Sequence, residues 1–183
     1  MNKTISTKER LLQAARDLFW TRGYSNVSVR DITGAAGVDA ALVSRYFGGK
    51  QGLFEATLAE IPHWEALDAS REDLLAKTVE SISEPYDPET DNVNPFTMLL
   101  ANVIDPVMGE KTRELVQQAL ADPLADKVGG ADADERVAKL LAVLFGVALM
   151  RKNFQLLGLA DKSPEELRSL LMKLGQKALE TEG

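Results

Sequence analysis

The sequence predicts an all-α protein of about nine helices, because apolar residues recur at helical spacing along most of its 183 residues. Serine residues followed three positions later by an acidic residue mark helix starts, as at Ser6 with Glu9 and at Ser163 with Glu166. No segment shows the alternating pattern of a confident strand. With 45% apolar residues, the chain has enough apolar material for a sizeable core.

Four helices are expected in the first third of the chain. Ser6 caps the first, and Gly23 ends it because glycine most easily adopts the left-handed cap conformation. Ser28 starts the second, and Gly37 makes the turn after it. The third is expected from Asp39 to about Tyr46 and the fourth from about Lys50 to Pro62.

Five further helices are predicted in the rest of the chain. Proline and acidic residues predict loops over residues 84–95 and, with glycine, near residues 122–132. Helices are expected at residues 69–83, 96–103, 107–121 and 133–157, and from Pro164 onward.

Composition excludes several functional classes. The chain has no cysteine, which rules out disulfides, thiolate metal sites and cysteine nucleophiles, and its one histidine, His63, argues against a histidine metal pair. No cofactor is therefore expected. The longest apolar run, Leu140 to Met150, is too short to span a bilayer, and the N-terminus lacks a signal-peptide pattern. We expect a cytoplasmic protein that is not an enzyme.

Charge is divided unevenly along the chain. The net charge is −7, but residues 1–52 hold eight Lys/Arg and four Asp/Glu, a balance of +4. The other 131 residues hold 13 basic and 24 acidic side chains, a balance of −11. The N-terminal segment is therefore the part suited to a polyanion, unless both segments are ordinary solvated surfaces.

The segment from Ser28 to Lys50, SVRDITGAAGVDAALVSRYFGGK, predicts a helix-turn-helix. Most of its apolar pattern would suit any helical hairpin. Ala40 and Ala41 are more specific, because small side chains at the exposed start of the second helix permit close approach to base edges. Arg30 is placed to reach a guanine or a phosphate. Side chains able to anchor phosphates surround the same surface: Ser28, Ser44, Arg45, Tyr46 and Lys50.

The run LLQAARDLFWTRGYSNVSVRDITGAAGVDAALVSRYFGGKQGLF, residues 11–54, resembles the TetR/AcrR family of bacterial transcriptional regulators. The later stretch LFGVALMRKNFQLLGLADKSPEELRSLL is similar to the last two helices of one branch of that family. The resemblance implies a homodimer whose first three helices bind DNA. It also implies that helices four to seven enclose a ligand cavity and that the last two form the dimer interface.

Carried over by position, the resemblance implies phosphate contacts at Ser28, Tyr46 and Lys50. It implies base contacts at Arg30, Ala40, Ala41 and Ser44. Position 44 is most often tyrosine or histidine in the family, so Ser44 removes a ring contact that Arg45 or Tyr46 would replace.

The C-terminal part supplies the predicted dimer interface and ligand pocket. The helix from residue 133 has two apolar rows, of which one would face its own domain and the other a partner subunit, unless both are internal to a monomer. The pocket residues, or alternatively plain core residues, are predicted to be Trp64, Phe96, Leu99, Val103, Leu115, Phe145 and Leu149. The predicted domains are residues 1–49 for DNA binding and 50–183 for ligand binding and dimerisation.

The predicted function is a ligand-responsive regulator: a homodimeric repressor that a small-molecule inducer releases from a palindromic, double-stranded operator. An activator or architectural DNA binder of the same fold is the first alternative. A helical enzyme or ligand-binding bundle that merely carries a helix-turn-helix is the second, although no nucleophile–base pair supports it.

Overall fold

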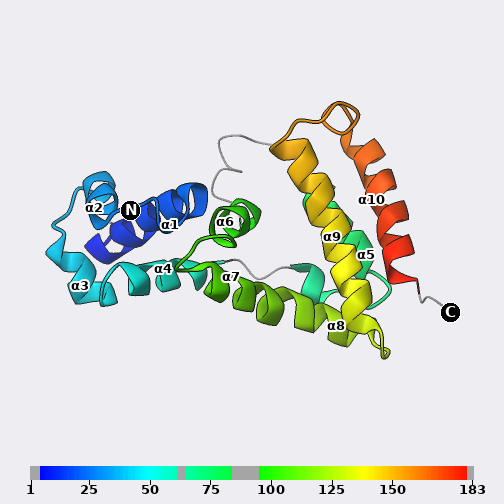
Figure 1. Cartoon of the computed structure of the whole chain (residues 1–183), viewed down its shortest axis with the longest axis horizontal. Helices are drawn as coiled ribbons and strands as arrows, with labels where there is room; N and C mark the ends of the chain where they lie inside the picture. The colour runs from blue at the N-terminus through cyan, green and yellow to red at the C-terminus, as the bar shows by residue number, and fades with distance from the viewer. Residues whose placement is uncertain (1–4, 62–64, 84–94, 181–183) are drawn as a thin grey trace. The chain divides into compact units, whose positions relative to one another are not determined.

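The computed structural model describes residues 5–61, 65–83 and 95–180, and every element in these ranges is helical (Figure 1). The predicted all-α fold class is confirmed. The described helices include none long and apolar enough to cross a membrane. The loop predicted at residues 84–95 lies almost entirely outside the described residues.

The chain divides into two compact units. The head unit comprises Met1–Pro62 and Asp87–Glu114, and the body unit comprises His63–Tyr86 and Leu115–Gly183. The head thus joins the first four helices to two later ones. The division after residue 49 into a DNA-binding and a ligand-binding domain stays a prediction.

The head unit is built around its first helix, α1. Its elements are α1 (Thr7–Arg22), α2 (Val29–Ala36), α3 (Ala41–Phe47), α4 (Lys50–Leu58), α6 (Pro95–Asn102) and most of α7 (Gly109–Val116). Helix α1 packs against α2, α4 and α6, so it touches both the helix-turn-helix and the later part of the unit (Figure 1).

An aromatic cluster holds the head unit together. The rings of Phe19, Tyr24 and Phe54 meet with centroids 5.3–5.5 Å apart, and both phenylalanines are fully buried. Two of these contacts are edge-to-face, the arrangement that ring quadrupoles favour. The cluster joins α1 to α4 and fixes the chain just after α1 ends.

Capping boxes mark the starts of α1 and α2. Ser6 with Glu9 and Ser28 with Asp31 each form a capping box in which both reciprocal hydrogen bonds are present. Gly37 has φ +63°, the left-handed conformation that a tight turn between α2 and α3 requires. The predicted starts of the first two helices are therefore confirmed.

The body unit packs five helical elements around the long helix α9 (Ala133–Lys152). The others are the 3₁₀ helix η1 (Glu65–Asp68), α5 (Leu74–Ser83), the π-helical turn η3 (Gln117–Ala121), α8 (Asp122–Val128) and α10 (Pro164–Leu179). One apolar cluster joins α9 to α5 and α10, and a second joins α9 to α5 and α8.

Two predicted boundaries in the body unit were wrong. Residues 122–128 form α8 rather than a loop, and the π-helical turn just before them accommodates Pro123, which has no N–H to bond back along the helix. Helix α9 ends at Lys152, five residues earlier than predicted, and the chain then turns through Gln155 with φ +48° and Gly158 with φ +85°.

Candidate DNA-binding site

Helices α2 and α3 form the helix-turn-helix that the sequence predicts. The carboxylate of Asp39 accepts a hydrogen bond from the Ala41 N–H at 2.7 Å, and this bond starts α3. Ile32 and Val43 are buried beneath the two helices. Because the inner faces are fixed in this way, the outer face of α3 has a defined set of exposed side chains.

The structure exposes seven of the eight predicted DNA-contacting residues and half-buries the eighth, Lys50. Ala40 and Ala41 lie exposed at the start of α3, with Ser44 one turn later, so that end of the helix carries only small side chains. Arg30 is exposed on the first turn of α2. The individual contacts stay predictions.

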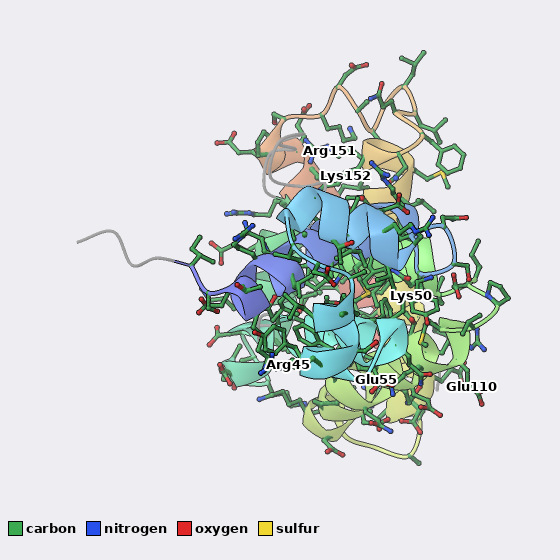
Figure 2. All side chains as sticks on the ribbon, turned by 90° about the vertical axis from the view of Figure 1, so that its left-hand side faces the viewer. Arg45, Lys50, Glu55, Glu110, Arg151 and Lys152 are labelled. Carbon is green, nitrogen blue, oxygen red and sulfur yellow. The ribbon has the colours of Figure 1, made fainter. Side chains whose placement is uncertain are left out.

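Figure 2 looks onto this end of the head unit. Arg45 on α3 and Lys50 at the start of α4 lie on opposite sides of α3 in this view. The guanidinium carbon of Arg45 lies 6.0 Å from the ring centroid of Tyr46, which is 39% exposed. Cationic groups thus flank the small-residue surface on both sides, where phosphates would lie beside a helix in a groove.

Lys50 is held over an aromatic face. Its Nζ lies 4.0 Å from the ring centroid of Tyr24, which is within the range of a cation–π contact. Burial lowers the pKa of the Lys50 amine, while the carboxylates of Asp105 and Asp31 act in the opposite direction. The ammonium therefore has a fixed position at the start of α4, rather than the wide range of a free lysine.

Ser28 is the N-cap residue of α2 and also an exposed residue of the predicted DNA-binding surface. Its hydroxyl donates to the Asp31 carboxylate at 2.6 Å and accepts from the Asp31 N–H at 3.1 Å. The hydroxyl bond to the carboxylate, together with a bond from the Ser28 N–H to the same carboxylate at 2.7 Å, lowers the pKa of the Asp31 carboxyl. Because the single hydroxyl proton is used in the cap, a phosphate at this position would bind the N–H groups of the first turn of α2.

Sequence reasoning missed two residues that position this site. Arg10, on α1, donates from Nη2 to the carbonyl of Gly37 at 3.1 Å and to that of Ala36, so it holds the turn before α3. Asn102, at the end of α6, is fully buried and binds the backbone where α1 ends. Each of these contacts joins residues more than 25 positions apart in the sequence, so no local sequence pattern could have revealed it.

The predicted pocket residues are divided between the two units. Trp64 lies outside the described residues, as does the side chain of Phe96 on α6. Leu99 and Val103 belong to the head unit and are half-buried. The other three belong to the body unit and are also half-buried: Leu115, Phe145 and Leu149. Their role as a pocket stays a prediction.

A metal site finds no support in the described ranges, where no group of three or more His, Cys, Asp or Glu side chains could hold an ion. The arrangement instead offers a basic, small-residue surface on a helix-turn-helix. Such a fold and surface define a DNA-binding protein.

Comparison with known proteins identifies the family. The family model described as "Bacterial regulatory proteins, tetR family" matches residues 11–57, and the model described as "Tetracyclin repressor-like, C-terminal domain" matches residues 68–179. The chain therefore belongs to the TetR family of transcriptional regulators, which are DNA-binding proteins and not enzymes.

One curated relative and two solved structures illustrate the likeness. The "Probable HTH-type transcriptional regulator YttP" of Bacillus subtilis (strain 168) is 43% identical over 56 residues, which is 31% of this chain and 27% of that protein. The chain thus matches under a third of this relative's length.

The two solved structures cover nearly the whole fold. CifR, a TetR family regulator determined as a cysteine mutant with 26-base-pair operator DNA, is 19% identical, with a TM-score of 0.68 over 96% of this chain and 98% of CifR. A transcriptional regulator from Saccharomonospora viridis in complex with choline is 21% identical, with a TM-score of 0.63 over 92% of this chain and 95% of that one. At these identities the likeness shows the fold alone.

Proposed function

We propose that the chain is a homodimeric repressor that binds a palindromic operator and is released by a small-molecule inducer. The carrying observation is the surface of α3, where exposed small side chains are flanked by Arg45 and Lys50. Small side chains admit the helix to a major groove, and the flanking cations favour phosphates over other partners. The protein would act in the cytoplasm, on the DNA that it binds.

The burial of α9 supports a partner subunit. The row Val137, Leu141, Leu144 and Ala148 is buried within the body unit. From the second predicted row, Leu140 is also buried, whereas Val143, Val147 and Met150 stay half-buried. Leu170 and Leu174 on α10 are half-buried as well. Apolar side chains left partly uncovered on two adjacent helices suit the closure of a four-helix bundle by a second copy.

A dimer also suits the proposed DNA target. Two copies related by a two-fold axis present two α3 helices, which read two inverted half-sites about one helical turn apart. A single copy would read only one half-site. The proposal therefore requires a palindromic operator.

The proposed inducer is a small organic molecule, and the predicted pocket residues within each unit are the candidate contacts to test. The related protein from Saccharomonospora viridis was determined with choline, which makes choline a reasonable first probe. Whatever its identity, the inducer must bind the form that cannot engage DNA more tightly than the form that can, because equal affinity for both shifts nothing.

Contacts within the head unit supply a route from α6 to the helix-turn-helix. Asn102 ties the end of α6 to the end of α1, and Asp105 accepts a hydrogen bond from the Ser25 N–H at 2.8 Å. A displacement of α6 by an inducer would therefore act on the segment that leads into α2.

Selection of DNA from a random-sequence pool tests the proposal. The expected product is an inverted repeat whose affinity falls when the inducer is added. Failure to enrich any sequence would remove the DNA-binding proposal and favour a helical ligand-binding protein instead. The sign of regulation is tested by a reporter in a deletion strain: increased expression indicates a repressor, and decreased expression indicates an activator of the same fold.

A further inference from the structure

Side chains from the start of α1 contact the turn before α3 and the last residue of α3. At the turn before α3, the Arg10 guanidinium donates hydrogen bonds to the carbonyls of Ala36 and Gly37. At the other end, the Lys8 ammonium lies 5.7 Å from the ring centroid of Phe47, the last residue of α3. One turn of α1 therefore places Arg10 at the turn before α3 and Lys8 at the end of the helix that carries the predicted base contacts.

Lys8 is exposed and yet held in place. The face of an aromatic ring attracts an ammonium group at this distance, which restricts where the long side chain extends. The adjacent carboxylate of Glu9 accepts the Ser6 N–H at 2.7 Å in the capping box. Lys8 thus presents a positive charge to solvent at the edge of α3.

The side of α3 on which α1 starts is also informative. Figure 2 shows the start of α1 on the same side of α3 as Arg45, with Lys50 on the opposite side. A helix about 10–12 Å thick fills a major groove about 12 Å wide, so sugar–phosphate backbones run along both of its sides. The predicted phosphate contact at Lys50 serves one side, and on the other side the start of α1 lies beside the predicted phosphate anchor Arg45.

We propose that the start of α1 is a second phosphate-binding edge of the DNA interface. Lys8 contacts the backbone on the Arg45 side, and Arg10 is a positioning residue that fixes the turn before α3. This inference rests on the proposed function, since it needs duplex DNA at α3. The partner is the sugar–phosphate backbone, so the contact carries no base preference of its own.

Binding of a short mixed-sequence DNA duplex at several salt concentrations tests the contact at Lys8. Each lost phosphate contact lowers the slope of log affinity against log salt by about 0.9. Because the proposed dimer would lose one contact from each copy, Lys8→Gln should lower the slope by about 1.8 and weaken the affinity several-fold, whereas Lys8→Arg should keep the wild-type slope. Lys173→Gln, which removes the same charge from an exposed position on α10, is the matched control and should leave the slope unchanged.

The outcome separates this inference from the proposed function. If the wild type binds duplex DNA and Lys50→Ala lowers the slope, but Lys8→Gln does not, the edge at α1 is refuted and the DNA-binding function stands. If the wild type shows no salt-dependent binding, the proposed function itself is refuted. Thermal unfolding of each variant confirms that the folded protein is compared.

The positioning role of Arg10 is tested by comparing the affinity for the selected operator with the affinity for the mixed-sequence duplex, rather than by measuring protein stability. Arg10→Met should weaken binding to the selected operator several-fold more than binding to the mixed-sequence duplex, because a loosened turn misplaces α3 while Lys8, Arg45 and Lys50 keep their charges. Arg10→Lys should recover part of that preference, since it keeps the charge but lacks the planar fork. Equal losses on both duplexes would overturn the positioning role.

Discussion

The side-chain carbonyl of Asn102 accepts a hydrogen bond from the Tyr24 N–H at 2.8 Å, in a fully buried position. Its amide nitrogen donates to the carbonyls of Phe19 at 3.0 Å and Met98 at 2.9 Å. Helix α1 ends at Arg22 and the Phe19 carbonyl also accepts the Gly23 N–H, so it is the Tyr24 N–H, beyond the helix, that needs a partner from elsewhere. One amide therefore ties α6 to the end of α1.

We expect Asn102→Leu to destabilise the protein. The replacement is of similar size but leaves the buried Tyr24 N–H without a partner, at a cost of about 1–3 kcal/mol. The midpoint of urea unfolding should fall accordingly. Asn102→Gln keeps the amide but moves it by one methylene, so it tests position rather than polarity. An unchanged midpoint in Asn102→Leu would contradict the role of this bond.

Two glycines of the head unit should respond in opposite ways to alanine. Gly23 has φ +80° and ψ 156°, and a Cβ there would lie 2.7 Å from the backbone carbonyl oxygen of Ala101. Gly23→Ala should therefore cost at least about 1–3 kcal/mol from backbone strain alone.

Gly34 is the matched control for this substitution. It lies within α2, and a Cβ there would have no atom within 4 Å. Gly34→Ala should stabilise the helix by about 0.5–1 kcal/mol, because alanine loses less conformational entropy on folding. Thermal unfolding of both variants checks the pair, and a stabilised Gly23→Ala would show that α6 does not crowd the end of α1.

Local signals explain why the starts of α1, α2 and α10 could be predicted. Ser6, Ser28 and Ser163 each form a complete capping box, because every atom of that motif comes from residues three apart. The turn at Gly37 could be predicted because it requires only a residue that readily adopts a positive φ angle. The end of α9 and the helix α8 were predicted wrongly, since apolar runs and proline–aspartate pairs do not fix a boundary without their tertiary neighbours.

The positioning residues of the site could not be predicted for the same reason. Arg10 and Asn102 act through backbone carbonyls and N–H groups, which every residue has, so the sequence near their partners carries no mark of the contact. Exposure of Ala40, Ala41 and Ser44 was predictable from helical spacing alone. Their contacts with bases stay predictions, because they depend on a second molecule.

Acid should weaken the fold through its capping boxes. Hydrogen bonds from Ser28 lower the pKa of the Asp31 carboxyl, and bonds from Ser163 together with Lys162 lower that of Glu166. A carboxyl with a lowered pKa in the folded state stabilises the protein above its unfolded pKa, near 4, and this stabilisation is lost as the pH falls through the folded pKa.

Substitution at one capping box tests this dependence. Glu166→Gln keeps an acceptor for the Ser163 N–H but cannot titrate, so the stability of this variant should fall less between neutral pH and about pH 3 than that of the wild type. Glu165→Gln removes the same charge next to the box without touching its bonds, and it serves as the control. Urea unfolding at both pH values gives the comparison, and equal responses of the two variants would contradict it.

On the predicted DNA surface, Arg30 is expected to contact a base and Lys50 is expected to contact a phosphate. If Arg30 reads a base, Arg30→Ala should cost about 1–3 kcal/mol of affinity for the selected operator and relax its preference at one position, with little effect on a mixed-sequence duplex. Arg30→Lys keeps the charge but not the two-pronged donor, so it should lose most of that preference too.

Lys50→Ala should instead weaken binding to all sequences alike and flatten the salt dependence, because a phosphate contact releases counterions. Titrations of both duplexes at two salt concentrations separate these outcomes. Unchanged affinity in both alanine variants would refute the assignment of this surface, and a uniform loss in Arg30→Ala would move Arg30 to the phosphate contacts.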